Sequence, residues 1–143
     1  MTLKELIASG FGVGEDYDHS YNCAERILNG ANQVYGLGLD NNALHMAGGF
    51  AAGLFVGSTC GTICAAVMVI SRLETNFSQH RTPSLRAKLE KLLGKYEADV
   101  GSLLCRDLRP IYGEQNRCLP LLLKTADMLD RYYVELKQEQ GVS

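Results

Sequence analysis

The sequence predicts an all-α protein, and three observations support that prediction. Apolar residues recur at the 3.6-residue spacing of helices in several long segments, most clearly in 83–100 and 117–137. Glycines, prolines and capping residues separate these segments where helices would begin and end. No segment of useful length alternates apolar and polar residues, as a half-buried strand would. We therefore expect a single domain over residues 1–143, with about five to seven helices around a glycine-rich central helical segment.

The first two helices are expected between residues 2 and 36, and a third is expected to begin near residue 40 and run into the segment from Met46 to Ile70. Residues 2–8 form a short apolar pattern, and the next helix is expected to begin near Ser20, which can cap it. Gly36 is the expected end of that helix, because glycine readily adopts the left-handed conformation of helix C-termini. Asp40 or Asn41 can then cap a third helix. The second helix carries its apolar residues at helical spacing: Cys23, Ile27, Ala31 and Val34.

The sequence of the C-terminal half predicts three more helices. Residues 74–82, ETNFSQHRT, are polar and indicate a loop. Pro83 suits the first turn of the helix that follows, and Gly101 is its expected end. Ser102 can cap a short helix, SLLCRDL, and Asn116 can cap the last one. The predicted buried faces consist of Leu85, Leu89, Leu92, Leu93, Tyr96 and Val100 in the longer helix, and of Leu119, Leu122, Leu123, Ala126, Leu129, Tyr133 and Leu136 in the last.

The segment from Met46 to Ile70 contains no charged residue, although 21% of the chain is charged. Glycines recur at every fourth position of this segment, and residues four apart share one face of a continuous helix. Such a face would have almost no side chains, so a neighbouring backbone, a ligand or a second copy of the chain could approach closely. We therefore expect a central helix with a glycine stripe that could support a homo-oligomer. The stripe consists of Gly49, Gly53, Gly57, Gly61 and Ala65.

Two other interpretations of this segment are open. About 20 apolar residues can span a bilayer, but the glycines together with Ser58, Thr59 and Thr62 make the segment only weakly hydrophobic. No membrane association is therefore expected. Alternatively, the segment forms two short helices that break near Gly57 and Ser58, with no role beyond packing.

Composition limits the class of function. The formal net charge of −2 argues against a dedicated nucleic-acid-binding protein, which usually has a basic face. The N-terminus lacks the basic and apolar regions of a secretory signal, so we expect a cytoplasmic protein. Five cysteines in a reducing compartment indicate metal binding or redox chemistry more often than structural disulfides.

Four of the cysteines fall in the predicted first turns of helices: Cys23, Cys60, Cys105 and Cys118. Unpaired N–H groups and the helix dipole make that turn electropositive. We therefore expect lowered thiol pKa values and thiolates that attack disulfides or bind metals. Alternatively, these cysteines are small, inert core residues of a non-catalytic interaction or oligomerisation protein.

Spacing alone assigns no known metal site. No Cys-x-x-Cys pair is present, which excludes a zinc ribbon and a thioredoxin-type motif. Cys64 lies four residues after Cys60 and could face the same site on a continuous helix. Arg106, Asp107 and Arg109 are expected to form a charged surface turn.

The pattern resembles the C_GCAxxG_C_C family of small redox-active proteins, which are all-helical. The matching pieces are Asn22-Cys23-Ala24, GGFAAGLFVGSTCG, VGSLLCRDL, and Cys118 ahead of LLLKTADML, within residues 20–133. By position, the resemblance implies that the four family cysteines are Cys23, Cys60, Cys105 and Cys118. The chain departs from the central family motif in two places, since Thr62 replaces alanine and Ala65 replaces glycine, and Cys64 adds a thiol at a variable position of the motif.

We therefore expect a redox-active centre of Cys23, Cys60, Cys105 and Cys118, with an oxidoreductase or electron-transfer role. It would act by dithiol–disulfide exchange with a redox partner protein, or bind zinc, another metal or an iron–sulfur cluster on the four thiolates. On this interpretation, Cys64 is a further metal ligand, a resolving cysteine or a buried residue of the core.

Overall fold

The computed structural model describes residues 1–74, 83–113 and 117–141, and within these ranges the prediction of an all-α fold is confirmed. Three short irregular turns, η1 (Gly48–Phe50), η2 (Gly53–Gly57) and η3 (Arg109–Gly113), connect some of the helices. The described ranges contain no strand, only an isolated bridge between Thr59 and Leu104. The described residues form seven α-helices: α1 (Leu3–Ala8), α2 (Cys23–Tyr35), α3 (Asn41–His45), α4 (Gly61–Glu74), α5 (Pro83–Val100), α6 (Cys105–Leu108) and α7 (Leu119–Glu139).

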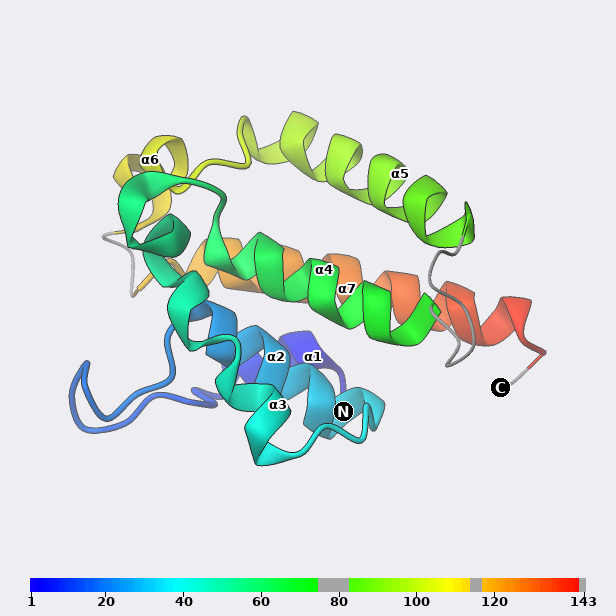
Figure 1. Ribbon diagram of the computed structural model, residues 1–143, viewed down its shortest axis with the longest axis horizontal. Helices are drawn as coiled ribbons and strands as arrows, with labels where there is room; N and C mark the ends of the chain where they lie inside the picture. Colours follow the sequence, from blue (N-terminus) through cyan, green and yellow to red (C-terminus); the bar gives the residue numbers. More distant parts are fainter. Residues whose placement is uncertain (75–82, 114–116, 142–143) are drawn as a thin grey trace.

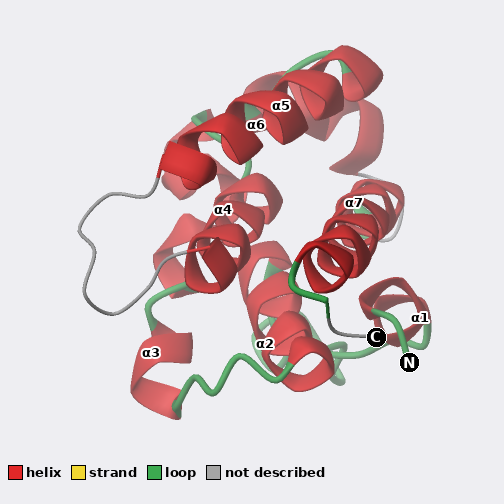
Figure 2. Ribbon diagram, turned by 90° about the vertical axis from the view of Figure 1, so that its right-hand side faces the viewer, coloured by secondary structure: helices red, strands yellow, loops and turns green. Residues whose placement is uncertain are grey.

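The long helices α4 and α7 lie side by side through the middle of the molecule (Figure 1). Helices α1 and α2 pack below this pair and α5 lies above it, while α6 and η2 meet at one end. Figure 2 shows α7 beside both α1 and α4. The main hydrophobic core forms between α2, α4 and α7, from residues such as Ile27, Val69, Ile70, Leu122 and Leu129, which are completely buried.

The helix boundaries follow from local capping. Asp40 caps α3 and Gly36 ends α2 in the left-handed conformation, as the sequence predicts. Thr2 caps α1. The predicted cap of α2 at Ser20 is wrong. Asn22 caps that helix instead, because it forms a reciprocal capping box with Glu25, whereas the Ser20 hydroxyl donates to the Asp16 carbonyl.

The predicted glycine stripe on a continuous central helix is wrong. Regular helix begins only at Gly61, and the preceding turns contain left-handed residues, with φ of 50° at Ala52, 62° at Leu54 and 60° at Phe55. Glycine disfavours helix by about 1 kcal/mol per residue, so this glycine-rich stretch yields to tertiary contacts. Gly53 packs so closely against the Ser58 backbone that no Cβ would fit. The alternative of a break near Gly57 and Ser58 is closer to the structure, although only the second part is a regular helix.

The C-terminal half agrees in its main features. Helix α5 ends at Val100 ahead of Gly101, and α7 carries a long buried face that includes Tyr132 in place of the predicted Tyr133. The Ser102 hydroxyl accepts from the Leu104 N–H, so the predicted short helix begins at Cys105 rather than directly after Ser102.

Some sequence predictions cannot be compared with the structure. The predicted loop lies outside the described residues except for Glu74, which belongs to α4, and the predicted cap at Asn116 also lies outside them. In the described ranges, no helix combines the length and hydrophobicity that crossing a bilayer requires.

Candidate functional site

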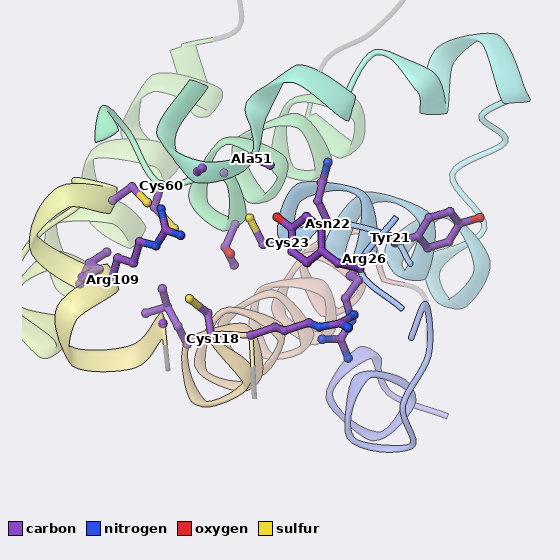
Figure 3. Close-up of a pocket in the computed structure, with 17 residues that line it drawn as sticks. Tyr21, Asn22, Cys23, Arg26, Ala51, Cys60, Arg109 and Cys118 are labelled. Atoms are coloured by element: carbon purple, nitrogen blue, oxygen red, sulfur yellow. The ribbon is translucent and has the colours of Figure 1, made fainter. Parts of the chain in front are cut away.

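A cavity of about 170 Å³ lies where the starts of α2, α4, α6 and α7 come together. Cys23 is the first residue of α2 and Cys105 is the first residue of α6, while Cys60 and Cys118 directly precede α4 and α7. All four line the cavity, and none is in a disulfide. The labelled side chains of Cys23, Cys60 and Cys118 extend toward the same space (Figure 3). Four thiols that are distant in sequence thus share one site.

The cap of α2 positions Cys23. The Asn22 side chain accepts from the Glu25 N–H over 3.0 Å, and the Glu25 carboxylate accepts from the Asn22 N–H over 3.1 Å. The Asn22 side-chain amide also donates to the Gly48 carbonyl over 3.1 Å. One asparagine therefore fixes the start of α2 and connects it to η1, directly beside Cys23.

Two backbone hydrogen bonds hold Cys60 and Cys105 together. The Cys60 N–H donates to the Leu103 carbonyl over 2.8 Å, and the Cys105 N–H donates to the Ser58 carbonyl over 2.7 Å. This is the short antiparallel bridge that joins the segment before α4 to the segment before α6. Because both bonds involve cysteine backbones, the relative placement of the two residues does not depend on side-chain packing alone.

Cys118 adopts an unusual backbone conformation. Its φ is 63°, and φ of the preceding Arg117 is 55°, so two consecutive non-glycine residues are left-handed. Such residues are strained and persist where surrounding contacts hold them, often at functional sites. The bend directs the chain from the cavity into α7, whose first turn closes with the Leu122 N–H on the Cys118 carbonyl over 2.9 Å.

The expected lowering of thiol pKa values is wrong for three cavity cysteines. Burial raises the thiol pKa of Cys23 and Cys105, and it raises the pKa of Cys118 to about 11. Negative charge on Cys60 adds to the rise in all three, whereas the Arg109 guanidinium acts against it at Cys105 and Cys118. Desolvation of the sulfur therefore outweighs the positive helix ends, and ionisation of one thiol opposes ionisation of the next.

Cys23 has the most groups arranged to stabilise a thiolate. The Ala52 N–H, the Thr62 hydroxyl and the Ala24 N–H each lower the pKa of Cys23, against the larger effect of burial. The Thr62 side chain lines the cavity, is completely buried, and its oxygen has no hydrogen-bond partner within the described part of the chain. An unpaired buried hydroxyl costs free energy. A thiolate at Cys23 would give it an acceptor.

Three arginines line the same cavity: Arg26, Arg109 and Arg117. The sequence does not distinguish Arg26, although its spacing from Cys23 by three residues places both on one face of α2. Arg109 is exposed, as predicted for a charged surface turn, but it also contributes to the cavity. No acidic residue of the described ranges lines this space, so the fixed charge around the thiols is positive.

Cys64 does not line the cavity. It lies one turn after Cys60 on α4, and its sulfur is 4.0 Å from the Thr59 carbonyl oxygen. Burial raises its thiol pKa, and negative charge on Cys60 adds to this. Cys64 therefore lies outside the cavity that the other four cysteines line, although negative charge on Cys60 affects its thiol.

The donor set suits zinc or an iron–sulfur cluster in its chemistry, since four thiolates are common ligands of both. The placement of the four thiols, however, does not suit either group. Across the described ranges, no three Cys, His, Asp or Glu side chains are grouped so that they could hold one metal ion.

The comparisons with known proteins agree with the arrangement of cysteines. No curated protein and no solved structure matches the chain. A family model described as "Putative redox-active protein (C_GCAxxG_C_C)" matches residues 21–132, which include all four cavity cysteines. The chain therefore belongs to the C_GCAxxG_C_C family.

Proposed function

We propose that the cavity is a thiol–disulfide redox centre, in which Cys23 and Cys60 form the reacting dithiol. The observation that supports this most directly is that four thiols from four parts of the sequence line one cavity. Cys60 is also 95% buried, which suits a resolving thiol better than the first attacking one. We assign Cys23 as the nucleophile because it is only partly buried and three donors favour its thiolate, against the larger effect of burial on its pKa.

The reaction begins with the Cys23 thiolate, which attacks one sulfur of a disulfide substrate. A mixed disulfide forms and the first substrate thiolate leaves. Cys60 then loses its proton and attacks the Cys23 sulfur, which releases the second substrate thiolate and leaves a Cys23–Cys60 disulfide. The two protons from the cysteines pass to the two substrate thiolates. Two electrons thus move from the protein dithiol to the substrate, which becomes two thiols.

A redox partner protein with its own dithiol would complete the cycle. Exchange of the Cys23–Cys60 disulfide with that dithiol regenerates both thiols and leaves the partner oxidised. Cys105 and Cys118 line the same cavity and supply a second pair of thiols, to which the disulfide can move by internal exchange. We place this chemistry in the cytoplasm, where the thiols are kept reduced.

Thiol labelling of the native, fully reduced protein tests the proposal. Cys23 should react first with a small alkylating agent, and an equivalent of a small disulfide should protect Cys23 and Cys60 from labelling. Cys64→Ser is the matched control, because Cys64 lies outside the cavity. It should not change the kinetics, whereas Cys23→Ser and Cys60→Ser should each abolish disulfide formation. Slow and equal labelling of all five cysteines, unchanged by the disulfide, would favour the rival view of an inert core.

Metal analysis and an optical spectrum of protein purified without oxygen separate the other candidates. The proposal expects neither stoichiometric metal nor a visible charge-transfer band. Stoichiometric iron with such a band would contradict it and favour a cluster on Cys23, Cys60, Cys105 and Cys118. Stoichiometric zinc without colour would likewise contradict it and favour a zinc site.

A further inference from the structure

We propose that the three arginines of the cavity select a small disulfide that carries carboxylate groups as the electron acceptor. This inference rests on the proposed thiol–disulfide function and adds the substrate class. It depends on the charges around the four thiols, the burial of Arg26 and the size of the cavity.

The cavity lining is strongly unbalanced in charge. Arg26, Arg109 and Arg117 line it, and within the described ranges no lysine, aspartate or glutamate does. None of the three arginines forms an ion pair with a described carboxylate. Three cations that gather on one cavity without an anion repel one another, and an anionic ligand would relieve that repulsion.

Arg26 is the most informative of the three because only 4% of it is exposed. Its Nε donates to the Phe11 carbonyl over 3.0 Å, and its Nη2 donates to the Ile7 carbonyl over 3.4 Å. These neutral acceptors use part of a guanidinium that has five N–H donors. Burial and the nearby Arg117 charge both lower the pKa of Arg26, whereas negative charge on Cys23 raises it, so an anion in the cavity would stabilise the guanidinium. A buried charge of this kind is costly unless it is paired.

Arg117 provides the outer part of the same positive surface. Its guanidinium carbon lies 5.6 Å from the centre of the Tyr17 ring, within the range of a cation–π interaction. Both residues line the cavity. The planar guanidinium then presents paired N–H groups, the geometry that binds a carboxylate through two parallel hydrogen bonds.

The positions of thiols and arginines fit a disulfide with a nearby carboxylate. Arg26 follows Cys23 by three residues on α2, so a carboxylate held by Arg26 would bring an attached disulfide toward the Cys23 sulfur. The cavity of about 170 Å³ is well below the roughly 300–1,000 Å³ of pockets for drug-sized ligands. It therefore suits one half of a small, unbranched disulfide better than a protein segment.

Three disulfides of matched length test this inference: 3,3′-dithiodipropionate, bis(2-hydroxyethyl) disulfide and cystamine, which are anionic, neutral and cationic. The measurement is the rate at which each oxidises the reduced protein, divided by its rate with dithiothreitol to correct for intrinsic reactivity. We expect the corrected rate to be about tenfold higher for the anionic than for the neutral disulfide, and lowest for cystamine. Added salt should reduce these differences.

Arginine variants connect the preference to the cavity. Arg117→Gln should lower the ratio of the anionic to the neutral rate severalfold, and Arg26→Gln should lower it further. Arg26→Gln also removes hydrogen bonds to the Ile7 and Phe11 carbonyls. If the Arg26→Gln protein does not fold, Arg117→Gln alone tests the inference. Arg131→Gln is the control, because Arg131 is exposed on α7 and pairs with Asp127 outside the cavity.

The outcomes separate this inference from the proposed function. If the neutral disulfide oxidises the dithiol but the anionic one is no faster, or if Arg117→Gln keeps the full preference, the charge-selection inference is wrong while the redox function stands. If none of the three disulfides forms a Cys23–Cys60 bond, the redox function is wrong and this inference with it.

Discussion

The sulfur of Cys23 lies against the backbone of Gly61: a Cβ placed on Gly61 would be only 3.0 Å from that sulfur. It would also collide with the Phe50 carbonyl oxygen. Gly61 therefore allows η1, the start of α4 and the Cys23 side chain to meet. This close approach gives a physical reason for a glycine directly after Cys60, and it brings the two proposed reacting residues together.

Gly61→Ala is predicted to destabilise the protein by about 1–3 kcal/mol, because overpacking forces the Phe50 backbone or Cys23 to move. It should also slow disulfide formation between Cys23 and Cys60. Gly94→Ala is the control, since a Cβ at Gly94 in α5 meets nothing within 4 Å. That change should raise stability by up to about 1 kcal/mol, because alanine favours helix. Equal unfolding midpoints in denaturant for the two variants would contradict the packing argument.

Thr62→Val is predicted to separate reactivity from stability. It removes a buried hydroxyl that has no partner in the described ranges, so the free energy of unfolding should stay the same or rise by about 1 kcal/mol. Because that hydroxyl lowers the pKa of Cys23, its loss should reduce the thiolate population and slow alkylation of Cys23 severalfold near neutral pH.

Thr125→Val provides the opposite control. Thr125 is also completely buried, but its hydroxyl is 2.8 Å from the Tyr96 hydroxyl. Its removal should cost about 1–3 kcal/mol and leave the alkylation of Cys23 unchanged. Faster alkylation of Cys23 in Thr62→Val would show that the hydroxyl does not support the thiolate.

The raised pKa of Cys118 predicts a loss of stability at high pH. The pKa of the Cys118 thiol is 9.0 in the unfolded state and is raised to about 11 in the folded state. Above pH 9 the unfolded state therefore releases its proton first, and stability falls as the pH rises from about 9 to about 11. Below that range the group contributes no pH dependence. Denaturant midpoints at about pH 8 and about pH 10.5 should thus fall less in Cys118→Ser than in the parent protein; parallel decreases would be inconsistent with the assignment.

Asn22→Ala is predicted to affect both the fold and the site. Loss of the capping box should cost about 0.5–2 kcal/mol, and loss of the bond to Gly48 should free the start of α2, so that Cys23 is held less firmly. Asp40→Ala removes a comparable cap from α3, which does not line the cavity. Both variants should lose stability in thermal unfolding, but only Asn22→Ala should alter the labelling rate of Cys23.

The helical class was predictable because apolar periodicity and capping residues lie within each helix. The turns at Ala52, Leu54 and Phe55 were not, because left-handed backbone at these residues depends on contacts with α6 that are distant in sequence. Those same turns place the Ala52 N–H where it lowers the pKa of Cys23. The missed element thus forms part of the site.

The four cavity cysteines were predictable as a set from the family pattern. They do lie near helix starts, but the predicted caps do not explain this, because Asn22 rather than Ser20 caps α2 and Leu104 rather than Ser102 directly precedes α6. Their acid–base behaviour was not predictable in the same way. A helix N-terminus lowers the pKa of a nearby thiol, and the sequence shows only this local effect. Burial by other elements is not visible in the sequence, and it determines the direction of the pKa shift at Cys118. Arg26 was overlooked because a charged residue on a helix is normally expected to face solvent.

The most direct measurement is disulfide mapping by mass spectrometry, after reduced protein has reacted with one equivalent of a small disulfide without oxygen. The account predicts a peptide pair joined through Cys23 and Cys60, with Cys64 still alkylated as a thiol. A disulfide that includes Cys64, or five thiols that all remain available for alkylation, would contradict the assignment of Cys23 and Cys60 as the reacting pair.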